Sequence, residues 1–346
     1  MVHNLASSFS GNAISSADCS PTDGAATNWP HSSAVRGTPL GSSPELIYLP
    51  YSHCKVQPNI SLAKFTSFRA GGPADRFAAP STIEQLEECI HWAQHHGYPI
   101  TFLGAGTNLL VSDRGVRGLV ICTRRLRHAV LDRDSAQLTA AAGEPIARLA
   151  WQVAELGWRG LEWAAGIPGT VGGAVAMNAG AHRQATSDVF LSAQVLLPNG
   201  TSKQLSVDEM QFSYRTSILQ QQHSIVTQAT FQLCPDSTAQ EVTAETRNFL
   251  NYRHTTQPYD LPSCGSVFRN PTDCRAGWLI EQTGLKGHQI GQAQVSQRHA
   301  NFIVNLKQAT AQNIFDLIGD VQQRVDDRWS VRLHPEVKIL GEFQTH

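Results

Sequence analysis

The sequence predicts an α+β protein with more than one domain, and three observations lead to that class. The chain has 346 residues, which exceeds the usual size of a single domain. From about Ile60 onward, short apolar segments with the length of strands alternate with segments whose apolar residues recur at helical spacing. Two segments rich in glycine, at residues 104–110 and 166–180, interrupt this pattern.

The composition is typical of a soluble globular protein, with 41% hydrophobic and 16% charged residues. The formal net charge of −1 argues against a broad basic field, so we expect no nucleic-acid partner. No apolar run approaches the roughly 18 residues needed to cross a bilayer, so we expect no membrane partner. The N-terminus also lacks the basic-then-apolar pattern of a secretory signal.

The seven cysteines show no C-x-x-C pair and no spacing typical of a zinc site. They lie at positions 19, 54, 89, 122, 234, 264 and 274. Their odd number and scattered positions indicate reduced thiols, and hence a cytoplasmic protein. We predict no metal site.

Residues 1–56 differ from the rest of the chain. They are rich in Ser, Ala, Gly, Asn and Pro and show no sustained apolar period. We therefore predict a disordered extension, in which only residues 46–50 have the apolar character to dock on a surface.

The next part of the chain begins with a predicted helix that Ser81 or Thr82 can cap and that Gly97 can end. Residues 99–103 and 118–122 are apolar and have the pattern of strands.

A second predicted helix begins after Pro145 and ends at Gly157. Residues 189–197 and 201–205 have the pattern of a hairpin around a Pro-Asn-Gly turn, and residues 224–233 have that of another strand. The sequence of the C-terminal part predicts three helices and two strands. The helices cover 241–253, 277–283 and 310–327, and the strands cover 301–305 and 336–340.

The segment LGAGTNLL at residues 103–110 follows a predicted strand. Its glycines can expose consecutive backbone N–H groups, and Thr107 and Asn108 add side-chain donors, as in a phosphate cradle. A Rossmann fingerprint does not fit, because Leu109 occupies the third glycine position and residues 111–115 do not continue as a helix. A plain tight turn remains an alternative for this motif alone.

Residues 166–180 contain five glycines separated only by small or mostly apolar side chains. A helix interior loses roughly 1 kcal/mol at each glycine relative to alanine, so we expect no ordinary helix here. Glycine is used where the main chain approaches a ligand closely or where φ is positive. No Gly-Lys-Ser/Thr follows, which argues against a P-loop. Two such segments about sixty residues apart predict a cofactor held between two small lobes.

Three further segments carry polar groups that are unremarkable in isolation. The segment SCGSVFRNP at 263–271 lacks the G-x-S-x-G of a serine hydrolase, and a structural turn is the simplest interpretation of its spacing. Tyr214-Arg215 and the HPE segment at 334–336 are, taken alone, typical of a solvated surface.

Taken together, the ordered motifs resemble those of the UDP-N-acetylenolpyruvoylglucosamine reductases (UDP-N-acetylmuramate dehydrogenases), flavoproteins of bacterial peptidoglycan precursor synthesis. The matching segments follow the family's order from about Ile60 to Phe343. They are TSFRAGGP at 66–73, GAGTNLL at 104–110, GIPGTVGG at 166–173, MNAGA at 177–181, FSYRT at 212–216, PSCGSVFRNP at 262–271, LIEQTGLKG at 279–287, VSQRHANFIV at 295–304 and HPEV at 334–337.

The resemblance implies noncovalent FAD in a two-lobed PCMH-type (vanillyl-alcohol-oxidase-like) fold, followed by an α+β substrate-binding domain. The FAD-binding lobes are then expected at 57–125 and 126–236, and the substrate-binding domain at 237–328. Residues 329–346 are expected to return to the active site as a strand.

The resemblance also implies that NADPH reduces the flavin and that the substrate, UDP-N-acetylglucosamine enolpyruvate, then takes a hydride from flavin N5 to give UDP-N-acetylmuramate. Arg215 would stabilise the charge that develops at the substrate carboxylate, and Glu336 would complete this polarising arrangement. Ser266 would donate the proton to the neighbouring carbon.

Ligand contacts are carried over position by position from the same resemblance. The expected FAD contacts are Arg69, Gly104, Ala105, Gly106, Thr107, Asn108, Leu109, Gly166, Gly169, Thr170, Gly172 and Gly173. The candidate cations for the substrate diphosphate are Arg253, Arg269 and Lys286. The partners implied are the UDP-sugar and NADPH, and we expect a monomer.

The chain departs from the family pattern at two places, where Ser67 replaces Asn or Thr and His182-Arg183 replaces Tyr-Gly. The sequence leaves two alternative functions open. One is another flavin oxidase or dehydrogenase of the same fold, which would not need Arg215, Ser266 and Glu336 together. The other is a nucleotide-binding module without catalysis.

Overall fold

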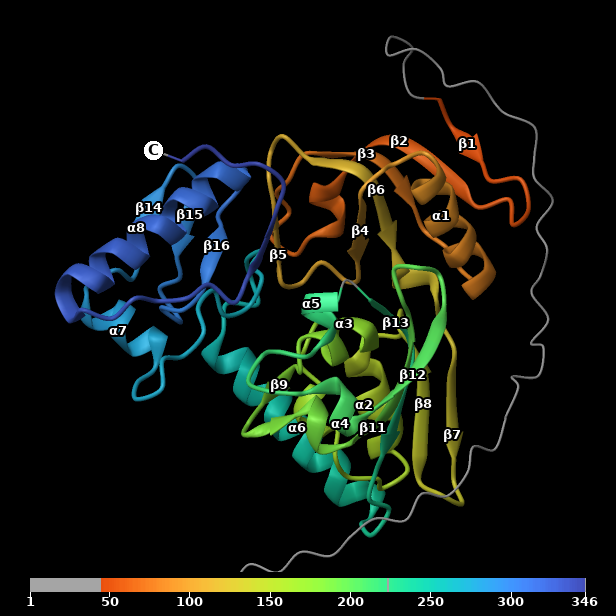
Figure 1. Cartoon of the computed structure of the whole chain (residues 1–346). Helices are drawn as coiled ribbons and strands as arrows, with labels where there is room; N and C mark the ends of the chain where they lie inside the picture. Colours follow the sequence, from red (N-terminus) through yellow and green to blue (C-terminus); the bar gives the residue numbers. More distant parts are fainter. Residues whose placement is uncertain (1–44, 223, 346) are drawn as a thin grey trace, which may run out of the picture. The chain divides into compact units, whose positions relative to one another are not determined.

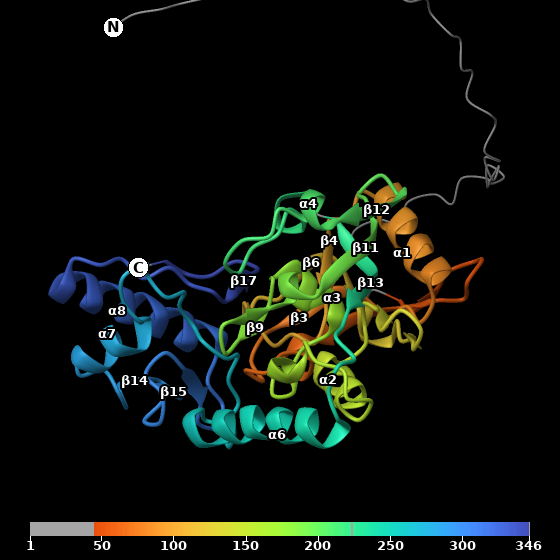
Figure 2. The same ribbon diagram turned by 90° about the horizontal axis from the view of Figure 1, so that it is seen from below.

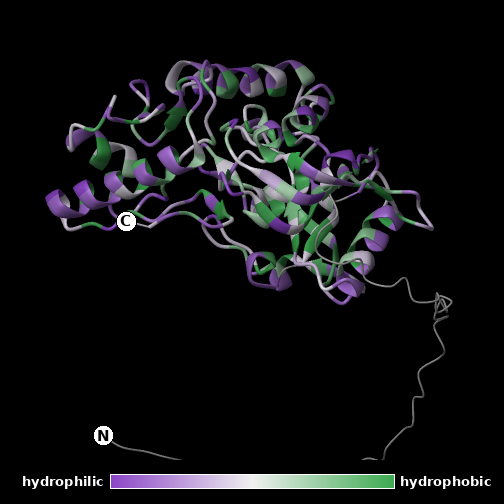
Figure 3. Cartoon of the chain, turned by 90° about the horizontal axis from the view of Figure 1, so that it is seen from above, coloured by the Kyte–Doolittle hydropathy of each residue, from purple (hydrophilic) through white to green (hydrophobic). Residues whose placement is uncertain are grey.

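The computed structural model describes residues 45–222 and 224–345. This part of the chain contains two five-stranded sheets, one three-stranded sheet and helices that pack on them (Figure 1). The predicted α+β class is confirmed. Hydrophobic residues concentrate on the strands, and the outer faces of the helices are largely hydrophilic (Figure 3).

The first five-stranded sheet has the order β1-β2-β3-β6-β4, and its last three strands are parallel. Its strands are β1 (Ile47–Tyr48), β2 (Lys55–Ser61), β3 (Pro73–Ala78), β6 (Val116–Cys122) and β4 (Ile100–Leu103). Helix α1 (Ile83–His95) lies against this sheet. The Thr82 side chain accepts a hydrogen bond from the Gln85 N–H, and Gly97 follows the helix at φ +67°, as the predicted cap and stop require.

The prediction of a disordered extension is wrong for residues 45–56, while residues 1–44 lie outside the described part of the chain. Residues 45–56 form β1, a turn and the start of β2. Leu49, Cys54 and Val56 are buried in one cluster with Leu86 and Ile90 of α1. Only a few separated apolar side chains dock here among polar residues, which is too few to produce a recognisable period.

The second five-stranded sheet, β12-β11-β13-β8-β7, is antiparallel throughout. Its strands are β12 (Ser202–Ser206), β11 (Phe190–Leu196), β13 (Ile225–Gln232), β8 (Gln137–Ala141) and β7 (Ala129–Asp132). Strands β11 and β12 form the predicted hairpin. Smaller elements surround the sheet and complete this lobe. They are α2 (Ile146–Ala154), α3 (Val171–Ala176), α4 (Val207–Met210), α5 (Leu219–Gln222), η3 (Glu162–Ala164), η4 (Thr186–Asp188), β9 (Gly180–Ala181) and β10 (Gln184–Ala185). The 3-10 helix η2 (Thr123–Arg125) instead follows β6 and packs against β4 of the first sheet.

The expectation that residues 166–180 contain no ordinary helix is wrong for α3. Two of the glycines, Gly172 and Gly173, lie inside this short helix. A Cβ on Gly172 would come 2.9 Å from the Cβ of Ala142, so the glycine allows α3 to pack closely on the chain that follows β8. The close packing offsets the poor helix propensity of glycine.

The C-terminal part contains a three-stranded sheet with the order β14-β15-β16 and three helices. The elements are β14 (Gln289–Ile290), β15 (Ala293–Val295), β16 (Ile303–Asn305), α6 (Ala239–Thr256), α7 (Ala276–Gln282) and α8 (Ala311–Trp329). The expected boundary at residue 237 assigns α6 to the substrate-binding domain, but α6 packs against α2 and η3 of the second lobe. Figure 2 shows α6 running from that lobe toward the C-terminal domain.

The last strand of the chain returns to the first lobe. Strand β17 (Lys338–Leu340) pairs in parallel with β5 (Leu109–Val111), which begins directly after the glycine-rich loop at 104–108. The 3-10 helix η1 (Leu62–Phe65) lies near the same loop, because Phe65 is in contact with Gly106. Segments distant in sequence therefore meet at this loop.

Replacing Leu49 with alanine tests the corrected N-terminal boundary. Leu49 is fully buried, so Leu49→Ala should lower the free energy of unfolding by about 2–5 kcal/mol, as measured by urea denaturation. The matched control is Leu46→Ala, because Leu46 is 45% exposed and should change stability by less than about 0.5 kcal/mol. Equal, small effects of both substitutions would contradict the docking of this segment.

Candidate functional site

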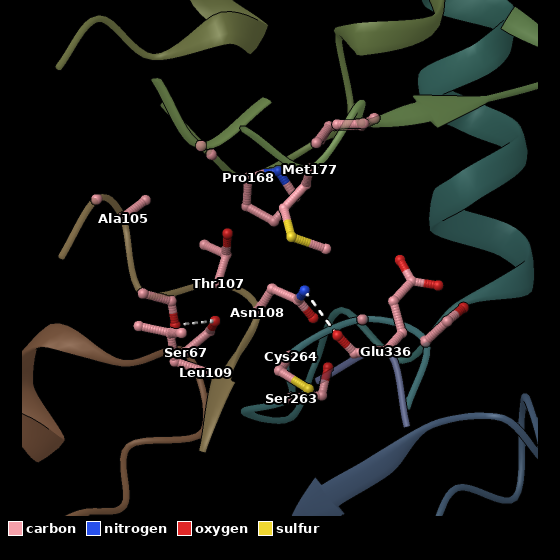
Figure 4. Close-up of a pocket in the computed structure, with 18 of the residues that line it drawn as sticks. Ser67, Ala105, Thr107, Asn108, Leu109, Pro168, Met177, Ser263, Cys264 and Glu336 are labelled. Atoms are coloured by element: carbon pink, nitrogen blue, oxygen red, sulfur yellow. Dashed lines mark hydrogen bonds between the residues drawn. The ribbon is translucent and has the colours of Figure 1, made fainter. Parts of the chain in front are cut away.

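A cavity of about 670 Å³ lies between the β4–β5 loop, the glycine-rich segment and residues 257–266 (Figure 4). This volume is within the usual range of a small-molecule site. Most of the predicted site residues line it. They are Arg69, Gly104, Ala105, Gly106, Thr107, Asn108, Leu109, Gly169, Thr170, Gly173, Arg215, Arg253, Ser266 and Glu336.

The loop at 104–108 exposes donors toward this cavity. Within the described residues, none of its five backbone N–H groups donates a hydrogen bond to another residue. Gly106 has φ +67°, and a Cβ there would come within 1.9 Å of the Phe65 carbonyl oxygen. A Cβ on Gly104 would come within 2.8 Å of Thr170 Oγ1. Consecutive unpaired N–H groups in a loop that begins Gly-Ala-Gly fit an anionic group such as a cofactor diphosphate.

The carbonyl side of the same loop is held by Arg124, which sequence analysis missed. Its Nε donates to the Gly104 carbonyl at 3.2 Å, and its Nη2 donates to the carbonyls of Ala105 and of Phe65, the latter at 3.3 Å. The Ser67 N–H also donates to the Gly106 carbonyl at 3.0 Å. With the carbonyls bonded in this way, the N–H groups remain available to the cavity.

Arg215 and Glu336 form an ion pair at the cavity. Arg215 Nε lies 2.9 Å from Glu336 Oε1, without the alignment of a hydrogen bond. Arg215 Nη2 donates to the Gly180 carbonyl at 2.8 Å. Arg215 itself has φ +57°, a left-handed conformation that is uncommon for a residue with a side chain. Such strain is typically retained at functional sites.

Burial raises the pKa of the Glu336 carboxyl, and the charges of Arg215 and Arg269 lower it only in part. Its side chain is 15% exposed. Glu336 therefore retains its proton to higher pH than a solvated glutamate would. The neighbouring Lys338, which also lines the cavity, has its pKa lowered by burial and then by Arg269.

Ser266 lies on a loop that is fixed from both sides. The Val267 N–H donates to the Asn301 carbonyl at 2.9 Å, and the Glu336 N–H donates to the Val267 carbonyl at 2.7 Å. A Cβ at Gly265, which has φ +84°, would meet no heavy atom within 4 Å, so open space adjoins the serine. Ser266 thus shares the cavity with Arg215 and Glu336, close to the backbone of Glu336.

Four predicted contact residues do not line the cavity. Lys286 Nζ pairs with Glu281 at 2.8 Å, and Arg269 Nη2 lies 3.4 Å from the Arg215 carbonyl oxygen. Gly172 packs on Ala142, as described above. The remaining one, Gly166, is covered by two other residues.

Arg253 and Tyr259 cover Gly166, and of these two residues Tyr259 was not predicted from sequence. The Tyr259 hydroxyl donates to the Gly166 carbonyl at 2.8 Å and accepts a hydrogen bond from Arg253 Nε at 3.1 Å. Tyr259, Lys338, Met177 and Phe302 line the cavity. The sequence around Tyr259 contains no glycine-rich or charged motif, whereas Lys338 directly follows the HPEV segment at 334–337.

Among residues 45–222 and 224–345, no group of three or more His, Cys, Asp or Glu is arranged to hold a metal ion. The helices of this part of the chain are all too short or too polar to cross a membrane.

Two family models match the chain in sequence order. Residues 74–206 match the FAD binding domain, and residues 257–340 match the C-terminal domain of UDP-N-acetylenolpyruvoylglucosamine reductase. The free N–H groups of the 104–108 loop fall within the first match. The fold and the site therefore define a flavoprotein with a PCMH-type FAD-binding domain, as predicted.

Relatives that align with most of the chain identify the family. The UDP-N-acetylenolpyruvoylglucosamine reductase of Nostoc sp. is 56% identical over 300 residues, which cover 87% of this chain and 91% of the relative. That of Synechocystis sp. is 51% identical and covers 90% of this chain and 98% of the relative. The crystal structure of the Thermus caldophilus enzyme superposes with a TM-score of 0.72 at 32% identity, covering 83% of this chain and 100% of that one. The chain belongs to the UDP-N-acetylenolpyruvoylglucosamine reductase family, whose members are FAD-dependent oxidoreductases that use NADPH.

Removing the Arg124 side chain tests its role in fixing the loop at residues 104–108. Arg124→Ala should release the carbonyls of the 104–108 loop and weaken FAD binding by roughly 10- to 100-fold, as measured by titration of flavin fluorescence. The adjacent Arg125 is exposed and its side chain makes no hydrogen bond to another described residue, so Arg125→Ala should bind FAD like the parent protein. Unchanged affinity in a folded Arg124→Ala protein would contradict this role.

Proposed function

We propose that the protein reduces UDP-N-acetylglucosamine enolpyruvate to UDP-N-acetylmuramate, with noncovalent FAD and with NADPH as the electron donor. The observation that carries this proposal is the convergence of the Arg215–Glu336 ion pair and Ser266 on the cavity that the phosphate cradle lines. The names of the relatives that span most of the chain support the same substrate.

FAD fits the cavity through main-chain contacts. The N–H groups of residues 104–108 would hold its diphosphate, and Gly169, Thr170 and Gly173 would lie against the remainder of the cofactor. When bound, FAD supplies a carrier that accepts a hydride from NADPH and delivers it to the enol ether. The contacts in the cradle involve no side-chain charge, so Arg215 remains available for the substrate.

Arg215 would stabilise the negative charge that builds on the substrate carboxylate as an enolate. Its guanidinium group carries five N–H donors, of which Nε faces Glu336 and Nη2 bonds Gly180. The remaining donors can bind a carboxylate, and because the group is always charged and already fixed, it needs no reorganisation during the reaction.

Ser266 would donate the proton to the carbon next to the substrate carboxylate. A serine hydroxyl is a weak acid, so the step requires a basic enolate and a source that restores the proton. Glu336 fits a polarising role beside Arg215, either as a protonated acid that donates a hydrogen bond or through an ordered water. Burial raises the pKa of its carboxyl, against the effect of the neighbouring Arg215.

The substrate diphosphate requires a cation at the same cavity. Arg253 lines the cavity, whereas Arg269 and Lys286 do not, so Arg253 is the best supported of the three candidates. We infer further that the protein acts in the cytoplasm as a monomer, where NADPH and nucleotide sugars are the available small-molecule partners.

The proposed function is tested by adding the two substrates in sequence under anaerobic conditions. NADPH should bleach the flavin absorbance, and UDP-N-acetylglucosamine enolpyruvate should restore it with formation of UDP-N-acetylmuramate. Reduced flavin that is reoxidised by oxygen but not by this enolpyruvyl sugar nucleotide would instead indicate another flavin oxidase or dehydrogenase.

Replacing the proposed proton donor separates the two half-reactions. Ser266→Ala should slow flavin reoxidation by the substrate by about 10²- to 10⁴-fold and leave reduction by NADPH nearly unchanged, as measured by rapid mixing. The matched control is Ser263→Ala, which alters another serine that lines the same cavity. Normal reoxidation in Ser266→Ala, or an equal loss in both variants, would overturn the assignment.

A further inference from the structure

Two buried cysteines of the first lobe lie side by side. The Sγ atoms of Cys54 and Cys89 are 3.5 Å apart, and the two residues are 4% and 0% exposed. The structure describes six free cysteines, and among them this is the sole sulfur–sulfur contact. The pair lies outside the residues that line the cofactor cavity.

The two residues belong to elements that pack on each other. Cys54 directly precedes β2, and Cys89 lies on the buried face of α1. Glu88, next to Cys89, accepts hydrogen bonds from the backbone N–H groups of Tyr51 at 2.9 Å and Ser52 at 2.8 Å. These contacts hold the turn that carries Cys54 against α1, so the sulfurs remain in proximity without a covalent bond.

We infer that Cys54 and Cys89 form a reversible disulfide, which makes this pair an oxidative modification site that links the N-terminal hairpin to α1. With glutathione disulfide as oxidant, the Cys54 thiolate attacks one sulfur and releases one glutathione thiolate. Cys89 then attacks the sulfur of Cys54, releases the second glutathione, and passes its proton to the departing thiolate. Two protein thiols are oxidised and one glutathione disulfide is reduced to two thiols.

Cys54 is the residue placed to react first. It follows the turn at residues 50–53, in which Pro50, Tyr51 and His53 are exposed, so opening of this short turn uncovers its sulfur. The Cys89 thiol donates a hydrogen bond to Cys54, which lowers the pKa of Cys54 and raises that of Cys89. The thiolate is the nucleophile in exchange, so this asymmetry sets the order of the two attacks.

The proposal is tested by oxidising the folded protein, with FAD bound, with glutathione disulfide. Remaining thiols are then alkylated in denaturant and the peptides analysed by mass spectrometry. We expect a cross-linked pair of peptides that contain Cys54 and Cys89. Its mass should be lower by two hydrogens than the sum of the two reduced peptides, and dithiothreitol should separate them. The melting temperature should rise by several degrees and return on reduction, because the bond closes a loop of more than thirty residues in the unfolded chain. The rate of the flavin reaction should not change.

Two variants provide the controls. Cys54→Ser should abolish both the cross-link and the shift in melting temperature, whereas Cys122→Ser alters another buried cysteine and should preserve both. Counting the thiols of the oxidised wild-type protein also tests the disulfide. This measurement does not depend on whether either variant folds. Full alkylation of Cys54 and Cys89 after oxidation, or a cross-link that forms only in urea, would overturn the inference.

Discussion

The structure of the site depends on the two-sided bonding of the loop at residues 104–108. Arg124 and Ser67 bond its carbonyls on one side, which leaves a row of N–H donors facing the cavity. The same loop also positions the proposed catalytic carboxyl. Asn108 Nδ2 donates to the Glu336 carbonyl at 3.1 Å, and the Lys338 N–H donates to the Asn108 carbonyl at 3.0 Å. The proposed cofactor contacts and the proposed polarising carboxyl are therefore held by the same piece of main chain.

The electrostatics of the cavity follow from burying a carboxyl next to arginines. Burial favours the neutral form of Glu336, whereas Arg215 and Arg269 favour its charged form, and burial has the larger effect on the pKa. The ion pair fixes Arg215 at the cavity wall and leaves some of its guanidinium N–H donors available for a ligand. A fixed, largely buried cation suits a reaction in which negative charge develops on a substrate that is already anionic.

Much of this arrangement was predictable from sequence because its signals are local. The caps of α1, the hairpin of β11 and β12, and the glycines of the cradle each depend on neighbouring residues. Arg124 was not predictable, since its role depends on carbonyls 19 and 20 residues away that the sequence does not bring together. The apolar character of residues 46–50 indicated that they could dock, but the sequence did not show that α1 is the surface on which Leu49 is buried. Likewise, the sequence did not show that Lys286 pairs with Glu281.

The most direct test of the account is a crystal structure of the protein with FAD bound. We expect diphosphate oxygens about 3 Å from backbone nitrogens of residues 104–108, with Arg124 still bonded to the carbonyls behind them. A cofactor whose diphosphate is held by cationic side chains elsewhere, while these five N–H groups face solvent, would contradict it.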